Sequence, residues 1–125
     1  MPQSKSIVLW AAPVCWKAEE ALTWEIAQRG LQVERQVSVP IRYKDQMLSA
    51  PLRLDLLINQ LVIIECKATS EYNSIFEAQT LTYLRLTGLK LGLVINFGEK
   101  MVKRGIHRVV NGLPDDKTGK PRSNF

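Results

Sequence analysis

The spacing of apolar residues along the chain predicts two helices and four or five strands. Between residues 17 and 29, apolar side chains recur every three or four positions, as in an amphipathic helix, and Gly30 supplies the usual stop. From residue 31 to residue 43 the spacing changes to two, which predicts a long strand disturbed at Pro40. The first predicted elements are therefore a helix and a strand.

Two further apolar runs follow a predicted turn at residues 44–46. They cover residues 52–58 and 61–68, and only Asn59 and Gln60 separate them. Short polar links of this kind join neighbouring antiparallel strands. We therefore expect the two runs to form a hairpin.

A second helix is predicted over residues 74–87. Ser74 and Glu77 have the spacing of a capping box, in which each side chain accepts a hydrogen bond from a free amide at the helix start, and Gly88 marks the helix end. A nearly continuous apolar run over residues 89–97 then predicts a strand buried on both faces.

This order of elements, completed by a short strand at residues 106–110, predicts an α/β (α+β) domain with a mixed sheet flanked by helices. At 125 residues, 46% of them hydrophobic, the chain fits one compact domain. We expect the domain to span residues 17–110, after a separate N-terminal segment at 1–16. Residues 111–125 offer no apolar face and are predicted to form a mobile tail.

Charge and cysteine content narrow the expected environment. Seventeen Lys and Arg residues against twelve Asp and Glu give a net charge of +5, which favours an acidic partner such as nucleic acid. Cys15 and Cys66 lack the spacing of a zinc site or a disulfide framework, so a reducing cytoplasm is the simpler location. The apolar run at residues 7–16 is interrupted by Pro13 and is too short to span a bilayer, so no membrane partner is expected.

Three charged residues interrupt the apolar strands of the predicted hairpin. Asp55 lies inside one strand, where an unpartnered carboxylate is costly to bury, and Glu65 and Lys67 project from one face of the other. If the hairpin brings Asp55 beside Glu65, the site suits a hard cation with a lysine near the attacking water of phosphodiester hydrolysis. On this pattern alone, a structural ion pair with Asp55 capping a turn has about equal weight.

Gln79 and Tyr83 lie four residues apart, on one face of the second predicted helix, and could line the same pocket. The alternative for Tyr83 is core packing with its hydroxyl at the rim. For Glu77 the capping box is the preferred interpretation.

Five segments of the chain resemble the GxxExxY family. They are residues 30–36 (GLQVERQ), 53–57 (RLDLL), 64–68 (IECKA), 77–79 (EAQ) and 83–98 (YLRLTGLKLGLVINFG). The family is placed in the PD-(D/E)XK nuclease superfamily, so the resemblance implies a restriction-endonuclease-like core in the order αβββαβ(β).

The resemblance also implies site residues and a cofactor. The implied catalytic residues are Asp55, Glu65, Lys67, Gln79 and Tyr83. Asp55 and Glu65, with the backbone carbonyl of Cys66, would bind Mg²⁺ or Mn²⁺. Lys67 would polarise or stabilise the nucleophile, and Gln79 and Tyr83 would form the QxxxY motif.

The motif that names the family is absent. Its positions fall on Ala12, Cys15 and Ala18, so residues 1–16 resemble a divergent or truncated N-terminus. Because related nucleases place an acidic residue on this helix, Cys15 in its place predicts weak or absent hydrolysis. If the helix extends to Cys15, Glu19 shares a helical face with it and could partly substitute, but a solvated surface charge is the favoured interpretation.

Basic and aromatic residues elsewhere are given structural interpretations. A basic cluster after the buried strand could contact phosphates, but a solvated edge is favoured. It consists of Lys100, Lys103, Arg104, His107 and Arg108. Trp10, Trp16 and Trp24 are expected to pack against the protein and not to stack on bases.

Two functions from different classes remain open. The first is a metal-dependent nuclease that acts on DNA or RNA. The second is a catalytically weakened module of the same fold that binds nucleic acid or protein, with a homodimer through an exposed strand or the apolar N-terminus as one form.

Overall fold

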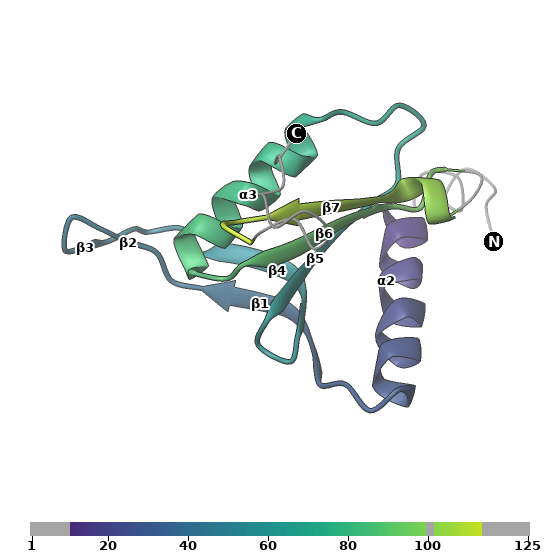
Figure 1. The fold of residues 1–125 in the computed structure, drawn as a ribbon, viewed down its shortest axis with the longest axis horizontal. Coiled ribbons are helices and arrows are strands. Elements are labelled where there is room, and N and C mark those ends of the chain that lie inside the picture. Colours follow the sequence, from purple (N-terminus) through teal and green to yellow (C-terminus); the bar gives the residue numbers. More distant parts are fainter. Residues whose placement is uncertain (1–10, 100–101, 114–125) are drawn as a thin grey trace, which may run out of the picture.

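A computed structural model describes residues 11–99 and 102–113 (Figure 1). Its helices are α2 (Ala11–Gln28), α3 (Ile75–Thr87) and the short 3-10 helix η1 (Val102–Gly105). Its strands are β1 (Val33–Val39), β2 (Arg42–Tyr43), β3 (Gln46–Met47), β4 (Leu52–Ile58), β5 (Val62–Lys67), β6 (Leu91–Asn96) and β7 (Ile106–Val110). The predicted order is confirmed, with η1 and the short β2–β3 hairpin added.

Five of these strands form one mixed sheet in the order β1-β4-β5-β6-β7. β5 and β6 are parallel and are connected through α3, whereas the other neighbours are antiparallel. β2 and β3 pair separately and project from one end of the domain (Figure 1). The predicted α/β (α+β) class with a mixed sheet flanked by helices is therefore confirmed.

The two long helices pack on opposite faces of the sheet (Figure 1). The core on the α3 face includes Leu54, Ile63, Leu84 and Val94. The core on the α2 face includes Leu56, Ile64, Cys66 and Ile95, together with Leu22 and Ile26 of the helix. Because side chains alternate along a strand, Cys66 of β5 faces α2, whereas its neighbours Glu65 and Lys67 face α3.

The turn between β4 and β5 confirms the predicted hairpin. Asn59 and Gln60 both have positive φ, 51° and 59°, as the two central residues of a type I′ turn require. Gly88 ends α3 in the left-handed region at φ 78°, also as predicted.

The capping box predicted for α3 is wrong. Ser74 has φ −62° and ψ −12°, and its side chain forms no capping hydrogen bond. Asn73 caps the helix instead, since its Oδ1 accepts the backbone N–H of Ile75 at 2.9 Å. Ser74 is already in the helical conformation, so the cap falls one residue earlier than the S-x-x-E spacing suggests.

The N-terminal helix is longer than predicted. It includes Ala11, six residues before the expected start, and Pro13 is accommodated in its first turn, where an N–H has no helical acceptor. Trp16 and Trp24 are 53% and 60% exposed, so neither lies in the core, although the Trp16 ring packs on the Arg35 guanidinium; Trp10 lies outside the described residues. In the described part of the chain, no helix combines the length and apolar character needed to cross a membrane.

Candidate metal centre

β4 and β5 separate at Asp55 and Glu65, and the two carboxylates bridge the gap. The ladder of paired residues ends at Leu56 and Ile64. Beyond it, the backbone N–H of Asp55 donates to Glu65 Oε2 at 3.1 Å, and the backbone N–H of Cys66 donates to Asp55 Oδ2 at 2.8 Å. Each carboxylate replaces a backbone carbonyl of the neighbouring strand as acceptor, which keeps these buried amides paired. We call this region the fork.

The fork disfavours negative charge on its carboxylates. Burial, and then the neighbouring Asp55, raise the pKa of Glu65 to about 8, against the opposing effects of the Asp55 N–H and the Lys67 ammonium. Burial also raises the pKa of Asp55, against the hydrogen bond from Cys66. A divalent cation would reverse this balance, because it stabilises the charged form of both groups.

Lys67, Gln79 and Tyr83 form a chain of polar contacts on the α3 side of the fork. Lys67 Nζ lies 3.5 Å from Gln79 Oε1, and Gln79 Nε2 donates to the Tyr83 hydroxyl at 2.8 Å. The ammonium also lies 4.7 Å from the centre of the Phe76 ring. Burial, followed by the charges of Glu65 and Asp55, raises the pKa of the Tyr83 hydroxyl, which keeps it protonated.

Glu19 approaches the fork from α2, which corrects the prediction of a solvated surface charge. Its side chain is 3% exposed. Arg35 Nε donates to Glu19 Oε1 at 3.1 Å, and Gln36 Nε2 lies 3.1 Å and 3.2 Å from its two oxygens. These donors come from β1, so the strand and the helix together fix the carboxylate in place.

A signal for Glu19 was present in the sequence. Cys15, Glu19, Leu22 and Ile26 are spaced by four, three and four residues, so they lie along one face of α2. Three of them pack on the sheet. A carboxylate within this core-facing stripe needs partners, but residues 11–16 had to be recognised as helical before the stripe became visible.

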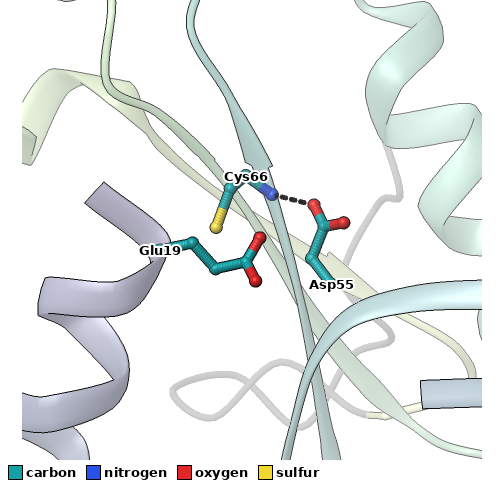
Figure 2. Close-up of side chains that lie close together, drawn as sticks. All are labelled: Glu19, Asp55 and Cys66. Atoms are coloured by element: carbon teal, nitrogen blue, oxygen red, sulfur yellow. Dashed lines mark hydrogen bonds between the residues drawn. The ribbon is translucent and has the colours of Figure 1, made fainter. Parts of the chain in front are cut away.

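The two cysteines meet at the same place. The Cys15 thiol donates to the backbone carbonyl of Cys66 at 3.4 Å, so the carbonyl expected to bind a metal carries a weak donor. The Cys66 side chain points from β5 toward Glu19 (Figure 2). The ligand atoms of Glu19, Asp55 and Cys66 all lie within 4.8 Å of one another.

A pocket of about 420 Å³ opens at the fork. Its lining includes all the residues predicted from the sequence: Asp55, Glu65, Cys66, Lys67, Gln79 and Tyr83. It also includes Cys15 and Glu19, which were considered for the acidic position of the first helix, and three residues not assigned to the site from sequence: Trp16, Gln36 and Arg53. The structure therefore brings the predicted residues together and adds a wall from α2.

The predicted basic cluster has a varied environment. Arg104 is exposed and Arg108 is half-buried, while Lys100 and the Lys103 side chain lie outside what the structure describes. The His107 ring stacks on Tyr72 at 3.9 Å, which is a packing role. Arg53, by contrast, is exposed and lines the pocket.

Comparisons with known proteins agree with this arrangement. The sequence profile of the PD-(D/E)XK nuclease superfamily matches residues 18–109. The crystal structure of SSO0001 is similar in fold, with a TM-score of 0.62 and 15% sequence identity over 85% of this chain and 52% of SSO0001. The chain thus spans about half the length of SSO0001. No curated protein matches it. Since the profile covers most of the chain, including the fork and α3, the protein belongs to the PD-(D/E)XK nuclease superfamily.

Proposed function

We propose that the protein is a metal-dependent nuclease of the GxxExxY type, which hydrolyses phosphodiester bonds in DNA or RNA. The observation that carries the proposal is the fork, where Asp55 and Glu65 share one hydrogen-bond network and Lys67 lines the same pocket. Membership of the superfamily supports the same chemistry.

The oxygen donors at the fork fit Mg²⁺ or Mn²⁺. Asp55, Glu65 and the carbonyl of Cys66 would hold the ion, and Glu19 adds a further carboxylate close to Asp55. The raised pKa of Glu65, about 8, indicates a buried carboxylate that lacks sufficient positive charge. When bound, the ion would polarise a phosphate oxygen and lower the pKa of a water nucleophile. The Cys15 thiol would have to leave the carbonyl, at small cost because thiols are weak donors.

The chain's own residues have distinct tasks in this mechanism. Lys67 stands at the mouth of the fork, where its ammonium binds the scissile phosphate and stabilises the negative charge that develops there. Gln79 accepts from this ammonium and donates to Tyr83, so the pair keeps Lys67 oriented. Arg53 also lines the pocket, where it could contact a neighbouring phosphate of the same nucleic-acid strand.

The net charge of +5 supports a nucleic-acid substrate. Two free thiols in one site fit a reducing compartment, which supports the cytoplasm as the proposed location. The basic side chains that line the pocket, Lys67 and Arg53, would bind phosphate groups, which DNA and RNA share.

The test compares wild type with Asp55→Asn and Glu65→Gln on labelled single- and double-stranded DNA and RNA, with Mg²⁺ and with Mn²⁺. Glu71→Gln is the matched control, because this carboxylate is exposed and outside the pocket lining. Because Cys15 replaces the carboxylate expected on the first helix, we expect weak cleavage by wild type and by the control, and none by either fork variant. Cleavage that persists in Glu65→Gln would overturn the proposal.

One observation favours a second function, a nucleic-acid-binding or protein-interaction module without cleavage. Cys15 stands where the resemblance expects a carboxylate, and its thiol occupies the Cys66 carbonyl. Such a module could pair with a second copy through an edge strand, β1 or β7. Cleavage gained only in Cys15→Glu would support this reading, whereas robust wild-type cleavage would exclude it and show that Glu19 suffices.

A further inference from the structure

We infer that the α2 side of the fork also binds a thiophilic divalent cation, Zn²⁺ or its analogue Cd²⁺, through Glu19, Asp55 and the Cys66 thiol. This donor set differs from the all-oxygen set proposed for Mg²⁺, which uses the carbonyl of Cys66. The inference goes beyond the proposed function, because cation binding by these three groups does not require the protein to cleave anything.

The Cys66 thiol is aimed into this group and has no competing partner. Strand geometry directs the N–H and C=O of Cys66 toward β4 and its side chain toward α2. Figure 2 shows the sulfur turned toward the Glu19 carboxylate, with Asp55 on the other side of that carboxylate. The residue is 5% exposed, and no hydrogen bond to its sulfur occurs within the described residues. Cys66 also packs in the α2-face core, but its sulfur lies within 4.8 Å of carboxylate oxygens of both Glu19 and Asp55, and this arrangement points to a ligand.

The Glu19 and Asp55 carboxylates are oriented by hydrogen bonds from groups that are not themselves proposed ligands. Arg35 and Gln36 fix Glu19, and the Cys66 N–H fixes Asp55 through Oδ2. The Cys66 N–H occupies only Oδ2 of Asp55, and the other polar neighbour of this carboxylate is the Gln36 side chain, which a cation would displace. Outer hydrogen bonds of this kind orient ligands and raise metal affinity.

The dimensions suit a small tetrahedral ion. Zn²⁺ bonds of about 2.3 Å to sulfur and about 2.0–2.2 Å to oxygen place ligand atoms about 3.2–3.7 Å apart. The three atoms here lie within 4.8 Å of one another, so side-chain rotations that close the set by about 1 Å complete the site. Three protein ligands leave the fourth position of the ion to solvent.

Zn²⁺ and Mg²⁺ differ in the ligand atoms that they prefer. A thiolate selects zinc-class ions, whereas Mg²⁺ takes oxygen ligands. Because both sets contain Asp55, the two ions compete for this carboxylate. Zn²⁺ should therefore displace Mg²⁺ from the fork and inhibit any Mg²⁺-dependent reaction.

The experiment titrates the reduced, metal-free full chain with Cd²⁺ and records the ultraviolet charge-transfer band of a cadmium–thiolate bond. We expect a band that saturates at one Cd²⁺ per chain, is lost in Cys66→Ser and persists in Cys15→Ser, the matched thiol control. The band should also persist in Glu65→Gln, which removes the proposed Mg²⁺ ligand, so failure of the nuclease proposal and failure of this one are distinguishable.

A second variant keeps the test decisive if Cys66→Ser fails to fold. Glu19→Gln should weaken Cd²⁺ binding by about 10–100-fold while the thiol remains in place. Absence of the band in wild type, loss of the band in Cys15→Ser alone, or unchanged affinity in Glu19→Gln would each overturn the inference.

Discussion

The stability of the metal-free protein should fall as the pH rises from 4.5, the ordinary pKa of Glu65, to about 8, its pKa in the folded protein. Burial and the Asp55 carboxylate disfavour the charged form of Glu65 in the fold, so the folded protein binds more protons than the unfolded chain in this range. Linkage then requires the free energy of unfolding to decrease as the pH rises. The contribution of protonated Glu65 is fully present below 4.5 and is lost above about 8.

The structure sets an upper limit on this effect. The interval from 4.5 to about 8 is about 3.5 pH units, and at about 1.4 kcal/mol per unit it corresponds to at most about 5 kcal/mol. Glu65 is only 5% exposed, so solvent screens it little. Burial raises the pKa of Asp55 as well, which adds a loss of the same sign to the wild-type curve.

Comparison with Glu65→Gln isolates the contribution of Glu65, because the amide mimics the neutral acid at every pH. Urea denaturation in the presence of a chelator, at a series of pH values, should show similar stability for both proteins at acidic pH. At alkaline pH the variant should be more stable by a few kcal/mol, on the order of the limit above. Added Mg²⁺ should restore the alkaline stability of wild type and not affect the variant.

Glu71→Gln serves as the control, since the same change at an exposed site should follow the wild-type curve. Wild-type and Glu65→Gln curves that run parallel between pH 4.5 and pH 8 would refute the reasoning, because Glu65 would then not hold its proton in the fold.

Three further predictions concern the surroundings of the site. Gly92→Ala should lower the free energy of unfolding by about 1–3 kcal/mol, since its Cβ would lie 2.8 Å from Thr80 Cγ2, and Thr80→Ser should recover part of the loss in the same urea assay. Arg35→Met should lower the free energy of unfolding by about 3 kcal/mol, because it leaves the buried Glu19 charge without its cation. Adding Glu19→Gln to this variant should restore most of the loss, and equal stabilities of the single and the double variant would contradict the prediction. Tyr83→Phe removes the hydroxyl that accepts a 2.8 Å hydrogen bond, so cleavage should fall while stability changes by only about 1 kcal/mol; unchanged cleavage would assign Tyr83 to packing.

The fold was predictable where local signals agree with tertiary packing. The Asn59-Gln60 link forces a tight turn, and Gly88 takes the left-handed conformation that ends a helix, so both boundaries follow from local chemistry. The capping box failed because Asn73 competes with Ser74 for the same amides, and spacing alone cannot rank them. For Trp16 the sequence did not show what the ring packs on, since its partner, the Arg35 guanidinium at 4.9 Å, comes from a strand that the fold brings beside α2.

The residues that the β4–β5 hairpin contributes to the site could be predicted from the sequence, whereas those from α2 and β1 could not. Asp55, Glu65 and Lys67 stand out as charges in apolar strands, and the hairpin register brings the two carboxylates together. Strand alternation cannot show that β4 and β5 separate there, because the separation depends on carboxylates replacing backbone acceptors. Glu19 could not be placed without knowing how α2 crosses the sheet. The contribution of β1, through its contacts to Glu19, is likewise a tertiary property.

The fork gives the protein a pair of native spectroscopic reporters. The amides of Asp55 and Cys66 donate directly to the carboxylates of the site, so the nitrogen and proton resonances of these two residues feel each change in carboxylate charge through a single hydrogen bond. A proton, a magnesium ion and a cadmium ion would polarise these bonds to different degrees. The state of the site can thus be followed at two backbone positions, without a label on the ligand and without a substrate.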